Sequence, residues 1–155
     1  MTIFSESVDL VRPISGSNKK FISQKGFKKM ASSKGQKTFN FALCVSSENS
    51  EAVEKAIASH ADWMRETHSL EAGGKIHLAD YYVAKADELN NVADPSQGTT
   101  GNILYSINET YILPEGIDQH MEKAMQWEGI EQFIGTLQKY GKVLIGGGTV
   151  IQALQ

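Results

Sequence analysis

Hydrophobic and polar residues alternate along residues 38–45, where Phe, Phe, Leu and Val occupy every second position. A period of two is typical of a β-strand with one buried face. The alternation returns at residues 75–84 and 102–113, which we predict as two further strands. An apolar run at residues 143–151 is interrupted by Gly146–Gly148 and predicts a fourth strand, with a bulge or a close strand crossing at the glycines.

Between these strands the hydrophobic period changes to 3.6 residues, which indicates helices. Residues 50–68 predict one amphipathic helix, and residues 117–140 predict a second helical region with an interruption at Gly129. Residues 86–101 are polar and contain Asp94-Pro95-Ser96, so we predict a long, turn-rich connection there. The apolar stripe of the first helix consists of Val53, Ala56, Ile57, His60, Trp63, Met64 and Thr67.

The resulting order is strand, helix, strand, strand, helix, strand. It predicts an α+β fold of the ferredoxin-like type, a β-α-β-β-α-β unit with an antiparallel sheet. Helices would cover one face of this sheet only, and an exposed apolar sheet face needs a partner. We therefore expect a homodimer, with residues 38–155 as the ferredoxin-like domain and residues 1–37 as a separate N-terminal arm.

Charge separates the arm from the domain. Residues 1–37 are rich in Ser and Lys and carry eight basic and two acidic residues, whereas the rest of the chain carries seven basic and sixteen acidic ones. The arm is interpreted as a solvated basic segment or one that folds back on the acidic domain, with a targeting segment or a nucleic-acid-binding arm as alternatives. Because the domain is acidic and the arm has few aromatic residues, we expect no nucleic-acid partner.

Compartment and partners follow from what the chain lacks. Cys44 is the only cysteine, so no disulfide can form within the chain. No run of 18 apolar residues is long enough to span a membrane, and the N-terminus has no apolar segment of the secretory kind. We therefore expect a cytoplasmic protein without a membrane partner.

Two histidines are the candidate catalytic residues. His60 falls on the apolar stripe of the first helix, and His120 adjoins the apolar positions of the second helical region. Each can be a core histidine satisfied by hydrogen bonds, or a pocket histidine that orients a ligand or moves a proton. His68 lies at the end of the first helix, and we expect it to be exposed to solvent.

The histidine spacing does not predict a metal site. His60 and His68 are eight residues apart, rather than the four of a helical zinc site, and no other set of histidine, cysteine and carboxylate has a known ligand spacing. His60 or His120 could supply an axial ligand to a haem. The expectation from the sequence is nevertheless no metal and no cofactor.

A set of large amphipathic residues could line an elongated apolar cavity for a small apolar or amphipathic ligand. The alternative is that these side chains only pack in the core. The candidate ligand-binding residues are Trp63, Met64, His77, Tyr81, Tyr105, Asn108, Met121 and Trp127.

Residues 38–154 as a whole resemble the dimeric α+β barrel superfamily, which includes antibiotic-biosynthesis-monooxygenase-like and related small stress-response domains. The best local match is the strand end Glu109-Thr110-Tyr111, followed by a helix with His120 near its start and Phe133 and Leu137 farther on. The resemblance implies two sheets packed face to face in a dimer and a pocket between each sheet and its helices. It also implies a cofactor-independent, monooxygenase-like enzyme. The alternative is a non-catalytic structural or regulatory dimer, and the sequence does not decide whether the protein is an enzyme.

Overall fold

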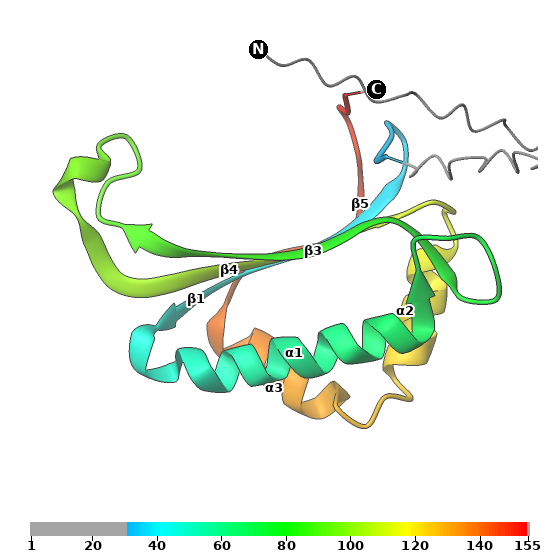
Figure 1. The fold of residues 1–155 in the computed structure, drawn as a ribbon, viewed down its shortest axis with the longest axis horizontal. Coiled ribbons are helices and arrows are strands. Elements are labelled where there is room, and N and C mark those ends of the chain that lie inside the picture. The colour runs from blue at the N-terminus through cyan, green and yellow to red at the C-terminus, as the bar shows by residue number, and fades with distance from the viewer. Residues whose placement is uncertain (1–30, 155) are drawn as a thin grey trace, which may run out of the picture.

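The computed structural model describes residues 31–154 and shows an α+β fold with one sheet and three α-helices in this part of the chain (Figure 1). The predicted N-terminal arm, residues 1–37, falls largely outside the described residues. No helix among residues 31–154 is both long and apolar enough to cross a membrane. In chain order the main elements are β1 (Lys37–Ser46), α1 (Ser50–Thr67), β2 (His68–Ser69), β3 (Ile76–Leu89), β4 (Thr99–Tyr111), α2 (Gly116–Ala124), α3 (Ile130–Tyr140) and β5 (Gly141–Thr149).

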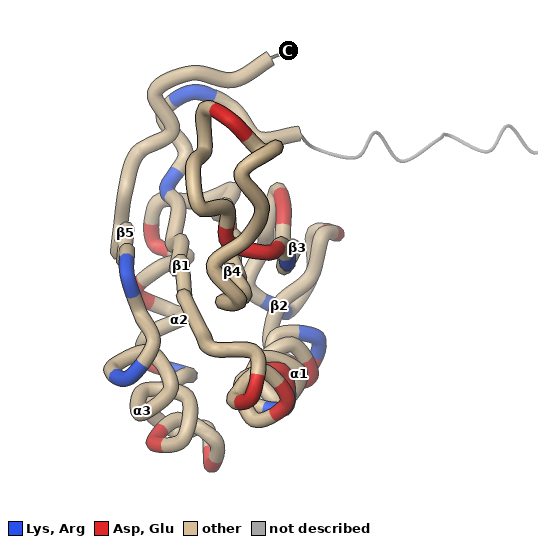
Figure 2. The backbone as a smooth tube through the Cα atoms, turned by 90° about the vertical axis from the view of Figure 1, so that its left-hand side faces the viewer, with Lys and Arg blue, Asp and Glu red and all other residues tan. Residues whose placement is uncertain are grey.

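The five strands form a mixed sheet with the order β2-β3-β4-β1-β5 (Figure 2). The pairs β3–β4, β4–β1 and β1–β5 are antiparallel, and the short β2 pairs with β3 in parallel. All three α-helices lie on the same side of the sheet, and within the described residues no helix covers the other side (Figures 1 and 2). The sheet therefore has an inner face toward the helices and an outer face without a helical cover.

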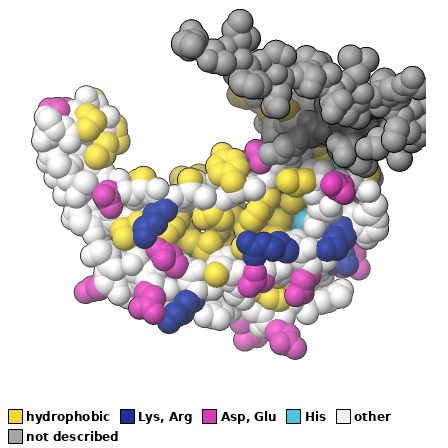
Figure 3. Space-filling view, viewed as in Figure 1, with side chains coloured by type: hydrophobic (Ala, Val, Ile, Leu, Met, Phe, Trp, Pro, Cys, Tyr) yellow, Lys and Arg dark blue, Asp and Glu magenta, His cyan; other side chains and the backbone are white. Residues whose placement is uncertain are grey.

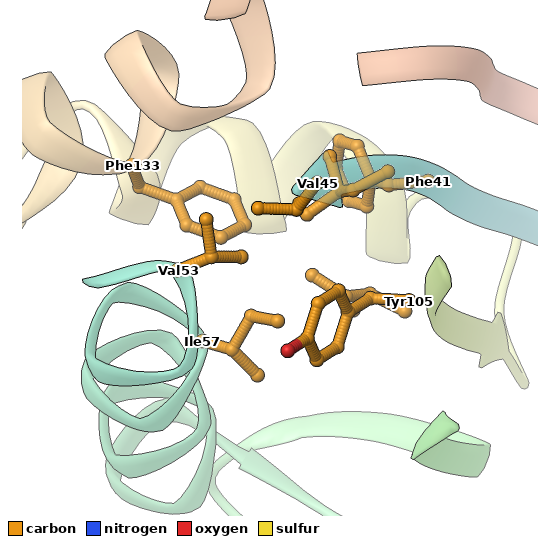
Figure 4. Packing of buried hydrophobic residues seen from close by; sticks show 8 residues of the cluster. Phe41, Val45, Val53, Ile57, Tyr105 and Phe133 are labelled. Carbon is orange, nitrogen blue, oxygen red and sulfur yellow. The ribbon is translucent and has the colours of Figure 1, made fainter. Parts of the chain in front are cut away.

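The core forms where the alternating strands meet the amphipathic helices. On β1 every second side chain, from Phe41 to Val45, is buried, as the period of two predicts. These side chains pack with Val53 and Ile57 of α1 and with Phe133 of α3 (Figure 4). Charged side chains of both signs lie along the side of the molecule that Figure 3 shows, with apolar side chains between them.

One predicted detail of the strands is wrong. Residues 86–101 are not a turn-rich connection: β3 continues to Leu89, β4 begins at Thr99, and only the tip of the hairpin is a loop. This hairpin extends beyond the helices (Figure 1), so its residues face water and show no apolar alternation. The fourth strand, β5, is continuous through Gly146–Gly148, with a register shift against β1 between Thr38 and Phe39 that fits the predicted bulge.

Candidate functional site

Glu109 is a fully buried carboxyl group on the inner face of β4. It stands between Ile107 and Tyr111 in the strand alternation, and all three side chains have 0% exposure. A carboxyl group in such a position is rare, because removing its charge from water costs several kcal/mol unless it is compensated. Glu109 was not among the predicted site residues. The available signal was its place in the alternation, where every neighbour two residues away on the same face is apolar.

Three of the four histidines are buried near this carboxyl group: His60 and His120 lie next to it, and His68 contacts His120. His60 comes from the buried stripe of α1 and His120 from α2. His68 follows α1 as the first residue of β2 and is only 4% exposed, so its expected exposure to solvent is wrong. The reason is the pairing of His68 with Ile76 of β3, which closes the end of α1 against the sheet. Only a small area of histidine is visible on the face shown in Figure 3.

A chain of hydrogen bonds joins one side of Glu109 to the end of α1. The Tyr111 hydroxyl donates to Glu109 Oε2 and lies 2.8 Å from His120 Nδ1. His120 Nδ1 is in turn 3.2 Å from His68 Nε2, and His68 Nδ1 is 2.7 Å from the Thr67 hydroxyl. Because that hydroxyl donates to the backbone carbonyl of Trp63, it accepts from His68, which leaves His68 Nε2 to accept from His120.

The other side of Glu109 is not satisfied by hydrogen bonds. His60 Nε2 lies 3.6 Å from Glu109 Oε1, and neither atom has a hydrogen-bond partner although both are buried. The other ring nitrogen, His60 Nδ1, is 3.4 Å from the hydroxyl of Tyr81 on β3. Glu109, His60 and His120 each offer one ligand atom within 4.8 Å of those of the other two, which makes them a candidate metal site within the described residues.

Glu109 and the three histidines His60, His68 and His120 form a buried cluster, and burial keeps all four side chains uncharged near neutral pH. Desolvation lowers the pKa of His60 and of His68 to about 3 and that of His120 to about 4. The same effect raises the pKa of Glu109 to about 8, although the hydrogen bond from Tyr111 opposes the shift. At pH 7 the histidines are therefore neutral bases and Glu109 is a neutral acid, a pairing that suits proton transfer.

An apolar cavity of about 130 Å³ adjoins the cluster, between the inner face of the sheet and helices α2 and α3. His60 and His120 are its only ionisable lining groups. A second, more open hollow between α3 and β5 shares four residues with the cavity, namely Phe41, Ile134, Leu137 and Leu144. The cavity is lined by Phe39, Phe41, His60, Trp63, His120, Met121, Ala124, Met125, Trp127, Ile130, Phe133, Ile134, Leu137 and Leu144.

Three of the eight predicted ligand-binding residues line this cavity, namely Trp63, Met121 and Trp127. Met64 and Tyr81 line a different hollow beside His68, although Tyr81 also contacts His60.

The structure places the other three predicted ligand-binding residues away from the cavity. Tyr105 is in the core, and its hydroxyl donates to Glu54. Asn108 is on the outer face of the sheet and accepts a hydrogen bond from Asn40, and His77 pairs with Ser69 at the edge of the sheet.

No protein-family model matches this chain, and no curated protein matches it at a significant level. We therefore infer the function from the geometry of the cavity and of the buried cluster.

Proposed function

We propose that this protein binds a small, largely apolar molecule in the cavity beside α2 and α3, and that the buried cluster exchanges a proton with it. The observation that supports this most directly is the shared lining: His60 and His120 belong both to the cavity and to the group around Glu109. An apolar hollow with a few convergent polar groups of perturbed pKa is the usual form of a small-molecule site.

The size of the cavity limits the ligand. An apolar cavity of about 150 Å³ accommodates benzene, so the 130 Å³ here suits a single ring or a short branched chain. The adjoining hollow between α3 and β5 gives a longer apolar substituent a way toward solvent. A lipid-like acid or a substituted aromatic ring would place its polar end at the histidines and its apolar end along α3.

The chemistry follows from the protonation states. A neutral imidazole of His60 or His120 can accept a proton from an acidic C–H or O–H of the ligand. Glu109 does not line the cavity, so its proton would reach the ligand only through Tyr111 and His120. The metal-free monooxygenase suggested by the resemblance would begin with this proton removal. The non-catalytic alternative predicts that the same side chains bind no ligand and only pack.

We also propose the ferredoxin-like class and the dimeric barrel for this domain. The strand order β3-β4-β1-β5, with α1 and the pair α2–α3 on one side, supports the class. The outer face carries Tyr82, Val143 and Ile145 with half of their surfaces exposed, and no described helix covers them. A second copy packed on this face would bury them.

Native mass spectrometry of the protein purified from cells tests both proposals. The expected result is twice the chain mass of 17.0 kDa with a reproducible small adduct. A monomer would refute the dimeric barrel, and Ile145→Lys should dissociate the dimer.

A cavity-filling variant tests the ligand site separately. Ala124 lines the cavity and is 4% exposed, so Ala124→Leu adds three carbons to a small space. We expect this variant to lose the adduct, and to lose binding of added phenol in calorimetry. The exposed Ala52 of α1 provides the matched control, since Ala52→Leu leaves the cavity unchanged. If Ala124→Leu keeps the adduct and binds phenol like the wild type, the cavity is not the ligand site.

A further inference from the structure

Two buried polar atoms of the cluster lack a hydrogen-bond partner. His60 Nε2 and Glu109 Oε1 face each other at 3.6 Å, hidden from solvent and without any hydrogen-bond partner. An N–H···O hydrogen bond is about 2.7–3.2 Å long, so a shared proton does not explain their separation. Buried polar groups without a partner require an explanation, and an ion is one of the usual ones. A cation between the two atoms would satisfy both.

We propose that His60, Glu109 and His120 together bind a divalent transition-metal ion. One ligand atom of each residue lies within 4.8 Å of those of the other two. His60 Nε2 is 3.6 Å from Glu109 Oε1, and His120 Nδ1 is 3.5 Å from the other carboxylate oxygen, Glu109 Oε2. Bonds of about 2.0–2.2 Å to a tetrahedral ion place neighbouring ligand atoms about 3.4 Å apart, so the site would close on an ion with small movements.

The surrounding contacts fit this role. The hydroxyl of Tyr81 lies 3.4 Å from His60 Nδ1, which leaves Nε2 directed at Glu109. The hydroxyl of Tyr111 donates to the other carboxylate oxygen of Glu109. Metal-binding histidines and carboxylates usually have such outer partners, which fix the orientation of the ligand. In the metal-free protein His120 Nδ1 donates to His68 Nε2 at 3.2 Å, so the ion would replace the proton on His120 Nδ1 and break this hydrogen bond.

The donor set indicates the class of metal. Two imidazoles and one carboxylate suit Zn²⁺ or Fe²⁺, whereas Mg²⁺ and Ca²⁺ prefer oxygen ligands. Because His60 and His120 also line the cavity, the ion would lie beside any bound molecule. The inference goes beyond the proposed function, since the ion can bind whether or not the cavity holds an organic ligand. While the ion is bound, the coordinating nitrogens of His60 and His120 do not accept a proton from that ligand.

The test uses the full-length chain without an affinity tag. After treatment with EDTA and desalting, the protein is titrated with Zn²⁺ in a calorimeter and with Co²⁺ in a visible spectrometer. We expect one ion per chain, d–d absorption bands of Co²⁺ with nitrogen and oxygen ligands, and no binding of Mg²⁺. The absence of Zn²⁺ and Co²⁺ binding would overturn the proposal.

Three variants locate the ion. Glu109→Gln, which keeps the shape of the side chain but cannot ionise to bind the metal, should weaken Zn²⁺ binding more than about 100-fold, and His60→Gln should do the same. His77 is the one histidine outside the cluster, so His77→Gln should bind Zn²⁺ like the wild type. Circular dichroism of each variant verifies that it is folded.

The opposite pattern refutes the site. If Glu109→Gln and His60→Gln bind Zn²⁺ as tightly as the wild type, or if only His77→Gln loses binding, the ion sits on the surface. The Ala124→Leu variant separates this proposal from the ligand proposal. It should lose the organic adduct but keep the Zn²⁺ affinity, because Ala124 is not a ligand.

Discussion

Replacing Glu109 by Gln should make the metal-free protein more stable at neutral pH. Burial raises the pKa of this carboxyl to about 8 from the ordinary value of 4.5, which it recovers in the unfolded chain. Between these two pH values, folding has to protonate Glu109. Gln has nearly the same shape, its amide oxygen can accept from Tyr111, and its amide N–H can face His60 Nε2.

The size of the gain follows from the two pKa values. At pH 7, protonating a carboxyl of pKa 4.5 costs about 3 kcal/mol, at about 1.4 kcal/mol per unit. The folded-state pKa is raised, so the contribution of Glu109 to stability is fully present below pH 4.5 and is lost as the pH rises toward 8. Glu109→Gln should therefore gain little at pH 5, about 3 kcal/mol at pH 7, and about 5 kcal/mol above pH 8.

Urea unfolding at pH 5, 7 and 8.5 measures this difference. EDTA is present throughout, because a bound cation would favour the ionised carboxylate. The matched control is Glu54→Gln on α1, where hydrogen bonds from Lys85 and Tyr105 lower the pKa and no alkaline gain is expected. The reasoning is refuted if Glu109→Gln is less stable than the wild type at pH 7, or if the difference is the same at all three pH values. Either result would mean that Glu109 is ionised in the folded protein.

Three further predictions concern stability. The pKa values of the cluster histidines are about 3 to 4 in the folded protein against 6.5 ordinarily, so their contribution to stability should be full above pH 6.5 and fall as the pH drops toward 3. Urea unfolding of Glu109→Gln, which lacks the opposite contribution of Glu109, would contradict their neutral burial if it gave the same stability at pH 7 and pH 4. Gly116→Ala would place a Cβ 2.6 Å from the Tyr111 ring and should destabilise by about 1–3 kcal/mol in thermal unfolding, whereas Gly135→Ala, with open space around it in α3, should stabilise slightly. Leu43→Ala should cost about 2–5 kcal/mol in urea unfolding, because Leu43 is 1% exposed.

The sequence predicted the elements well wherever one face of an element is buried. The stripe of α1 from Val53 to Met64 is buried as predicted, and the interruption at Gly129 separates α2 from α3. In both places the local period of the apolar residues reports directly on the face that meets the sheet. The far end of the β3–β4 hairpin has no buried face, so its residues carried no such signal.

The local hydrophobic period could not predict which segments far apart in the chain pair with each other. His68 follows the last turn of α1, where a side chain is exposed unless another segment covers it. The segment that covers it is β3, which pairs with β2 through Ile76. Nothing in the sequence around His68 indicates this pairing, because a two-residue strand is too short to show a period.

The proposed metal site could be predicted only in part, because its three residues come from three different elements. His60, Glu109 and His120 are 49 and 11 residues apart, and no known ligand motif has that spacing. Each of the three residues does give the same signal in the sequence: it is a polar residue at a position where the hydrophobic period predicts an apolar one. The sequence analysis identified His60 and His120 as candidate site residues from this signal, but it did not identify Glu109.

One polar residue at a core position can be explained as a buried group that is satisfied by hydrogen bonds. Three buried polar residues that meet around two atoms without hydrogen-bond partners are not explained in this way, because apolar residues of similar volume at these positions would give a more stable core. The predicted gain of about 3 kcal/mol in Glu109→Gln measures this cost for one residue at pH 7. If the variant gains stability and loses Zn²⁺ binding together, folding does not explain the carboxyl at position 109, and binding does.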